Sequence, residues 1–330
     1  MHHCIRHVII ITIIALAGFV GPSHAQAPNR WVQAWPQTDF TTALVDLSEI
    51  ESGGPPKDGI PAINSPEFYA ASKETKIGPH EPVVSVAFNG EARAYPVRYL
   101  MWHEIVNDTF GGTPVSVTYC PLCNTAVAFD GRLDGEALTF GVSGMLRYSD
   151  MIMYDRNTES WWQQFTGEAI VGKLRGKKLK TLPAKLQSWE AFVEEFGATS
   201  AVMKEPKGHS RAYGSNPYVG YDSLRKPWLY SGEPPSSGLP MMARIVRVED
   251  RAWPMSRVVD AGSLTEKGIK LSWRPGQASA LDTRSIAAGR DVGNIEVRDA
   301  ATGRPLAHEV TYVFVLQAFK PDGEWMMGGE

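Results

Sequence analysis

The sequence VSVTYCPLCNTAVAFD, residues 115–130, places two cysteines between two runs in which apolar residues alternate with polar or small ones. Alternation with a period of two is typical of β-strands. The second run ends at Asp130-Gly131, a dipeptide typical of turns. The stretch therefore predicts two neighbouring strands joined by a tight turn that carries Cys120 and Cys123.

Similar alternations lie on the N-terminal side of this stretch. VVSVAF at residues 83–88 and ARAYPV at residues 92–97 are separated by Asn89-Gly90. Asn-Gly between two such runs is a strong signal for a β-hairpin. We therefore expect antiparallel sheets to dominate the fold.

Helical spacing is confined to short segments. Residues 97–107 and residues 187–196 place apolar side chains three or four positions apart, and Ser188 is a suitable capping residue for the second segment. The combined pattern predicts an α+β fold that is mainly β, with antiparallel sheets and few short helices.

The chain also contains a faint internal repeat. EPVVSVAFNGEARAYPV at residues 81–97 resembles ARIVRVEDRAWPM at residues 243–255 if the Asn-Gly turn is shortened. Residues 115–130 resemble IKLSWRPGQASALD at residues 269–282, in the same order, but without the cysteines. Duplication of a β unit explains the repeat, and chance similarity between β-rich sequences is the alternative. If the unit is duplicated, one copy carries the chemistry.

Composition divides the chain into five parts. The predicted order is a signal peptide (1–25), an extended N-terminal segment (26–80), a first β unit carrying the CPLC motif (81–205), a Gly/Pro-rich crossing (206–240) and a second, degenerate β unit (241–330). The crossing contains GSNPYVGYDS and GEPPSSGLP, which favour a long irregular path over helices or strands.

The N-terminus predicts export. A basic start is followed by the apolar run VIIITIIALAGFVG and by small residues that end at Ala25. The run has about 14 residues, whereas a membrane-spanning helix needs roughly 20. A membrane anchor is the alternative, but we expect cleavage after Ala25, a periplasmic or secreted location and no stable membrane span afterwards. Cys4 leaves with the leader, so the mature chain keeps two of the three cysteines.

The net charge of the chain limits the class of partner. Lys and Arg number 33 and Asp and Glu number 36, which gives a formal net charge of -3 and a pI near 6.3. Such a balance provides no basic field to attract nucleic acid. We expect either a metal ion or a thiol/disulfide partner protein, and no nucleic acid.

The CPLC turn favours a metal site. Both sulfurs of a CxxC turn between strands can face one point, as a tetrahedral ion requires, and two thiolates with an imidazole suit copper(I) or zinc. His103 is the leading third ligand, and Glu104, Asn107 and Asp108 are candidates for the surrounding hydrogen bonds. A surface histidine on a helix is the alternative for His103.

Two other interpretations of the cysteines remain open. Cys120 and Cys123 could be the catalytic pair of a thiol-disulfide oxidoreductase, one attacking and the other resolving. They could also form a passive bridge, although closing so short a loop adds little stability.

A second polar cluster lies in residues 141–168. Arg147, Asp155 and Arg156 are candidates for lining a pocket, together with Asp150 and Glu159 and with two tryptophans as a wall. The alternative is a hairpin tip at Asp155-Arg156-Asn157, with the tryptophans in the core.

Several of these strings together resemble the DUF3179 family, a bacterial and archaeal family of domains of unknown function. They are AYPVRYLMWHEIVND, GGTPVSVTYCPLCNTAVAFD, GVSGMLRYSDMIMYDRNTESWWQQFTGEAIVG and YGSNPYVGYD. The resemblance extends from about Asp46 to about Pro321. It implies a shared fold and places the following residues at motif positions: His103, Cys120, Cys123, Arg147, Asp155 and Arg156. It implies no reaction.

The sequence thus leaves three hypotheses. The first is an exported metal-binding protein with a site formed by Cys120, Cys123 and His103. The second is a periplasmic oxidoreductase that uses the same cysteines. The third is a non-catalytic module that holds a sugar or peptide with Trp and Tyr side chains.

Overall fold

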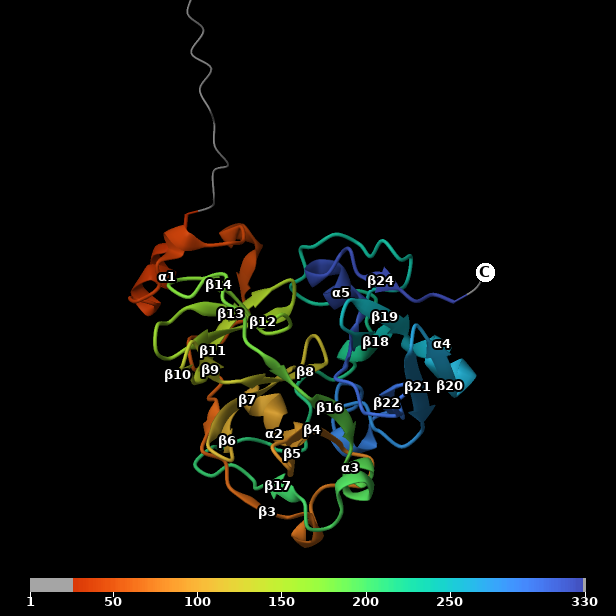
Figure 1. The fold of residues 1–330 in the computed structure, drawn as a ribbon. Helices are drawn as coiled ribbons and strands as arrows, with labels where there is room; N and C mark the ends of the chain where they lie inside the picture. Colours follow the sequence, from red (N-terminus) through yellow and green to blue (C-terminus); the bar gives the residue numbers. More distant parts are fainter. Residues whose placement is uncertain (1–25, 329–330) are drawn as a thin grey trace, which may run out of the picture.

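The computed structural model describes residues 26–328 and consists mainly of β-strands (Figure 1). The predicted signal peptide lies outside the described residues. The α-helices are short: α1 (Asn29–Ala34), α2 (Val97–His103), α3 (Trp189–Phe196), α4 (Met255–Ala261) and α5 (Val313–Phe319). Single 3-10 turns lie at Phe40–Thr42, Leu47–Glu49, Ala71–Lys73, Tyr221–Ser223 and Ile286–Ala288. The predicted mainly β class is confirmed.

The first sheet begins at the predicted hairpin. Strands β4 (Pro82–Phe88) and β5 (Glu91–Pro96) pair antiparallel, and Asn89 and Gly90 between them have φ of 50° and 79°. Two residues with positive φ define the turn that best matches the twist of a hairpin. The complete order is β16 (Ala184–Ser188), β4, β5, β17 (Ala201–Met203) and β3 (Phe68–Ala70).

The second sheet carries the cysteines. Its order is β15 (Thr181–Leu182), β8 (Thr125–Asp130), β7 (Thr113–Cys120), β6 (Ile105–Phe110) and β2 (Ile63–Asn64). The helix predicted for residues 97–107 is too long, because α2 ends at His103 and Glu104 has a φ of 58°. Ile105 and Val106 then enter β6, where β-branched side chains pack well.

A third sheet faces the cysteine turn. Its order is β1 (Ile50–Ser52), β11 (Phe140–Arg147), β12 (Asp150–Asp155), β13 (Trp161–Gln163) and β14 (Glu168–Val171). The small hairpin of β9 (Arg132–Leu133) and β10 (Glu136–Ala137) lies beside it. The N-terminal segment packs against this sheet, with Trp31 and Trp35 each about 5 Å from the ring of Trp161.

The C-terminal part repeats the connectivity of the first sheet. It contains β23 (Glu309–Tyr312), β18 (Arg244–Val248), β19 (Arg251–Pro254) and β24 (Glu324–Trp325), in that order. As in the order β16, β4, β5 and β17, the first two pairs are antiparallel and the last is parallel. Helices α4 and α5 stand where α2 and α3 stand in the first copy. This match supports the predicted duplication.

The remaining sheet completes the second copy. Strands β20 (Ser263–Glu266), β21 (Ile269–Arg274) and β22 (Asn294–Asp299) form an antiparallel set at the side of the molecule (Figure 1). The crossing between the copies runs irregularly from β17 to β18. The largest apolar core includes Cys120 and Cys123 from the first copy and Tyr312 and Phe314 from the second. The cysteine turn therefore lies where the two copies pack together.

No helix in residues 26–328 is long and apolar enough to cross a membrane.

Candidate functional site

The cysteine turn is a four-residue connection between β7 and β8. Cys120 pairs with Thr125, so residues 121–124 form the turn, and the N–H of Asn124 donates to the carbonyl of Pro121 at 3.1 Å. Asn124 has a φ of 48°, a conformation that asparagine tolerates better than most residues. The predicted strand-to-strand turn is confirmed. It brings both cysteine side chains to one side of a tight bend.

The second copy holds this turn in place. The hydroxyl of Thr311 on β23 donates to the carbonyl of Cys123 at 3.0 Å. The hydroxyls of Thr311 and Thr125 also lie 2.6 Å apart. Both threonines are fully buried, so these hydrogen bonds fix the backbone of Cys123 in a low-dielectric interior.

The hairpin between β11 and β12 closes the other side. Tyr148 and Ser149 form its two-residue turn, with φ of 51° and 66°, and neither is glycine. The carbonyl of Ser149 lies 3.7 Å from the sulfur of Cys120 and 3.5 Å from that of Cys123. Non-glycine residues in this conformation store backbone strain, which is common at functional sites.

Asp150, the first residue of β12, completes a group of three potential metal ligands. The sulfurs of Cys120 and Cys123 and a carboxylate oxygen of Asp150 all lie within 4.8 Å of one another. The three residues are buried, with exposed fractions of 1%, 0% and 0%. Among the described residues this is the one such group of cysteines, histidines and acids.

The two oxygens of Asp150 have different surroundings. Oδ2 accepts hydrogen bonds from Nε2 of Gln163 at 2.6 Å and from the N–H of Phe165 at 3.0 Å. Oδ1 is buried and has no hydrogen-bond partner among the described residues. A buried, unpartnered carboxylate oxygen in a residue that lies beside two thiols fits a metal ligand, because an ion would satisfy all three groups at once.

Burial changes the acidity of all these groups. It raises the pKa of both thiols, and the nearby charge of Asp150 raises them further. Burial raises the pKa of Asp150 to about 6, against hydrogen bonds that lower it. Glu104 is also buried, and burial followed by repulsion from Asp150 raises its pKa to about 8. No cationic side chain of the described chain forms an ion pair with these four groups.

These acidic groups have no cationic partner among the described residues, and the spacing of the two sulfurs also suits a bound metal cation. Two sulfurs bound to one tetrahedral zinc at about 2.3 Å lie roughly 3.8 Å apart, which is compatible with the observed grouping. Cys120, Cys123 and Asp150 would hold the ion, and Glu104 lies near enough to Cys120 to influence its charge.

His103, the predicted third ligand, lies apart from this group. Its Nδ1 is 2.7 Å from the carbonyl of Pro61, its Nε2 is 2.6 Å from the hydroxyl of Tyr213, and its ring lies 4.7 Å from that of His209. Burial lowers its pKa to about 4, so the ring is neutral at pH 7. Both ring nitrogens are thus engaged, and the group beside the two cysteines contains Asp150 and not His103.

Asn107 and Asp108, predicted to support the site, hold strands together. Asn107 Nδ2 donates to the carbonyl of Phe140 at 2.8 Å, and its Oδ1 accepts from the N–H of the same residue at 3.0 Å, which ties β6 to β11. Asp108 accepts from Arg93 at 2.6 Å and from Tyr95 at 2.5 Å. Glu104 is the predicted neighbour that the structure brings close to the sulfurs.

The cluster in residues 141–168 is divided among separate contacts. Arg147 donates to Glu49 at 2.7 Å, and Arg156 binds Asp58 at 2.8 Å. Asp155 accepts from the N–H of Thr158 at 2.6 Å, as expected of a hairpin tip.

Asp150 is the member of this group that the sequence does not predict beside the cysteines. The sequence places it among the pocket candidates of residues 141–168 instead. A local signal existed, because Asp150 is a lone acid directly before the apolar run MIMY.

The comparison with known families agrees with the resemblance in the sequence. The family model described as "Protein of unknown function (DUF3179)" matches residues 57–323, which is most of the chain and includes every residue of the cysteine site. The chain belongs to this family. No curated protein and no solved structure matches the chain. Membership in DUF3179 therefore does not indicate a reaction, and the function has to be inferred from the site.

Proposed function

We propose that this chain is an exported metal-binding protein that holds a zinc ion through Cys120, Cys123 and Asp150. The observation that carries the proposal is the grouping of two sulfurs and a carboxylate within 4.8 Å in the interior, with no cationic side chain of residues 26–328 in an ion pair with them. Burying unpaired charges is costly, and a bound divalent cation offsets that cost.

The carboxylate favours zinc over copper(I). Copper(I) prefers soft sulfur ligands, whereas zinc accepts a mixture of thiolate and carboxylate. Two thiolates and one carboxylate around Zn²⁺ leave a net charge of −1, and the same ligands around Cu⁺ leave −2. The smaller excess charge costs less in a buried site.

Thiol-disulfide exchange is the alternative chemistry for the same pair. The sulfurs are close enough to one another for it, but both are buried and their pKa values are raised. Reactive thiols are usually partly exposed, with a lowered pKa. The site in this form therefore supports metal binding better than attack on a partner's disulfide.

Elemental analysis of purified residues 26–330 tests the proposal. We expect one zinc per chain, lost in Cys120→Ser and strongly reduced in Asp150→Asn. His103→Gln should keep the ion, because the structure holds that ring between Pro61 and Tyr213. Stoichiometric copper with little zinc would correct the choice of ion. A metal-free chain whose thiols cycle between reduced and oxidised forms would replace the proposal with the redox function.

A further inference from the structure

The two sulfurs are closed off from solvent. Cys120 and Cys123 have exposed fractions of 1% and 0%, and Asp150 is equally buried. An ion or a thiol reagent in water cannot reach them unless part of the cover moves. This holds for metal exchange and for redox chemistry alike, so the structure has to contain an element that opens.

The crossing supplies the cover. Tyr221 is buried in the same apolar core as Cys120 and Cys123, and Tyr218 packs against that core. The ring of Trp228 lies over this layer, with its centroid 4.9 Å from that of Tyr221 and 6.3 Å from that of Tyr218. The crossing thus forms an aromatic layer on the core that contains the cysteines.

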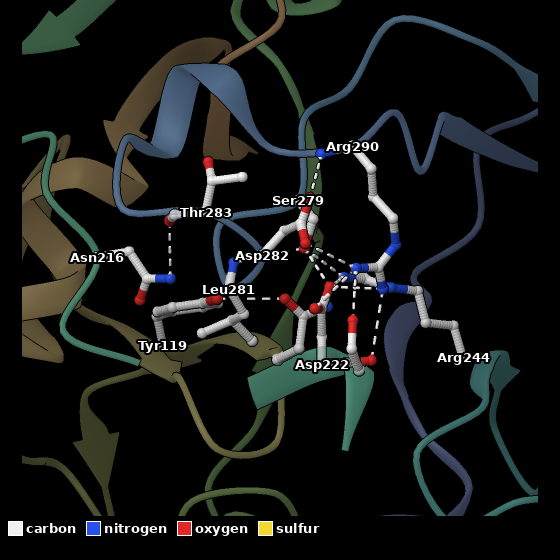
Figure 2. Close-up of polar contacts among 11 residues, drawn as sticks. Tyr119, Asn216, Asp222, Arg244, Ser279, Leu281, Asp282, Thr283 and Arg290 are labelled. Atoms are coloured by element: carbon white, nitrogen blue, oxygen red, sulfur yellow. Dashed lines mark hydrogen bonds and ion pairs between the residues drawn. The ribbon is translucent and has the colours of Figure 1, made fainter. Parts of the chain in front are cut away.

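The crossing is firmly anchored before this tryptophan. The buried carboxylate of Asp222 lies between the guanidinium groups of Arg244 and Arg290, at 3.1 Å and 2.8 Å (Figure 2). Ser279 donates to the same carboxylate. Nearby, Asn216 donates to the carbonyl of Thr283 at 3.1 Å (Figure 2). A buried ion pair of this kind is costly to separate, so this end of the cover stays in place.

The crossing is anchored again just after Trp228, at Tyr230. Tyr230 is buried, and its ring lies 5.9 Å from that of Tyr148 and 5.3 Å from that of Phe314. Its hydroxyl donates to the carbonyl of Glu233 at 2.9 Å. The movable part of the cover is thereby limited to residues 224–229.

Residues 224–229, here called the lid, are loosely held. They contain no helix or strand, and all of them except Pro227 are exposed. Leu229 has a φ of 52°, which is unfavourable for a leucine. Segments with few buried contacts and exposed backbone open at lower free energy than the core does.

One side chain connects the lid to the site. The hydroxyl of Ser149 donates to the carbonyl of Trp228, while the carbonyl of Ser149 faces both sulfurs. We propose that residues 224–229 form a lid over the cysteine site and that the Ser149 hydroxyl is its latch. Opening the lid releases this hydrogen bond and lifts Trp228 from Ser149 and Tyr221. This exposes the buried turn at Ser149, whose carbonyl lies against both sulfurs, while both anchors remain.

The inference rests on the proposed role of the cysteines as the working site, but its test does not need a bound metal. Alkylation of the metal-free chain by iodoacetamide, followed by mass spectrometry, measures access to the thiols directly. Below the unfolding transition, the rate should depend little on urea, because a local opening exposes little surface. Ser149→Ala should alkylate about fivefold faster, as expected for the loss of one hydrogen bond.

Ser236→Ala is the matched control. This serine also lies on the crossing and donates through its hydroxyl, to Gln317 at 3.1 Å, but beyond the second anchor. Its alkylation rate should equal that of the unaltered chain. A rate that follows global unfolding at every urea concentration, or equal rates for the two variants, would overturn the lid. Slow, urea-independent alkylation in a chain that binds no metal would keep the lid and remove the zinc proposal.

Discussion

Asp150→Asn should stabilise the metal-free chain and abolish the stabilisation that zinc provides. Burial raises the pKa of Asp150 from 3.8 to about 6, so at pH 7 the folded chain holds a charge that the unfolded chain carries at lower cost. A shift of that size corresponds to about 3 kcal/mol of lost stability at pH 7. Asparagine keeps a carbonyl oxygen for Gln163 and Phe165, so most of this cost should be recovered, about 2 kcal/mol.

The sign of the pH dependence is fixed by the direction of the shift. Between pH 3.8 and about 6 the folded chain binds more protons at Asp150 than the unfolded chain does, so this group lowers stability as pH rises through that range. The advantage of Asp150→Asn should therefore be present at pH 7 and disappear below about pH 4.

Urea unfolding with a chelator, and again with excess zinc, measures both effects. Zinc at a hundred times its dissociation constant should stabilise the unaltered chain by about 2.7 kcal/mol and the variant far less. Asp155→Asn is the control on the same strand, because Asp155 is equally buried but accepts from Thr158 and Trp162. It should lose stability and keep the response to zinc. A destabilised metal-free Asp150→Asn, or one with the full zinc response, would refute the reasoning.

Three further changes probe other parts of the chain. Burial lowers the pKa of His308 to about 4, so stability should fall by up to about 3 kcal/mol as pH drops from 6.5 to 4, and His308→Gln should flatten this acid limb in a urea series. Thr311→Val removes the hydroxyl that donates to Cys123, which should cost about 1–2 kcal/mol and weaken zinc binding in a competition titration, whereas Thr311→Ser should retain both. Ser188→Ala removes the cap that accepts from Ala191 and should lower the thermal midpoint by the equivalent of about 1 kcal/mol, with zinc content unchanged.

The parts of the fold that follow from neighbours in the sequence were predictable. The Asn89-Gly90 hairpin, the Ser188 cap and the strand-turn-strand around the cysteines each depend on a few adjacent residues whose dihedral preferences are known. The end of α2 was not, because residues 104–107 continue the helical spacing. Pairing of Ile105 with Thr118 in the sheet outweighs that local preference.

By itself, the sequence determined a mainly β chain and two cysteines on one bend, and it indicated a repeated unit, because local alternation and turn residues specify these features. Only the tertiary structure decided what meets those cysteines. The register of the β11/β12 hairpin brings Asp150 to the cysteines, and the packing of the second copy brings Thr311. His103 instead contacts the carbonyl of Pro61 and the hydroxyl of Tyr213. These contacts depend on how sheets pack between residues far apart in the sequence. Local dihedral preferences and periodicity do not specify which buried side chains will be in contact.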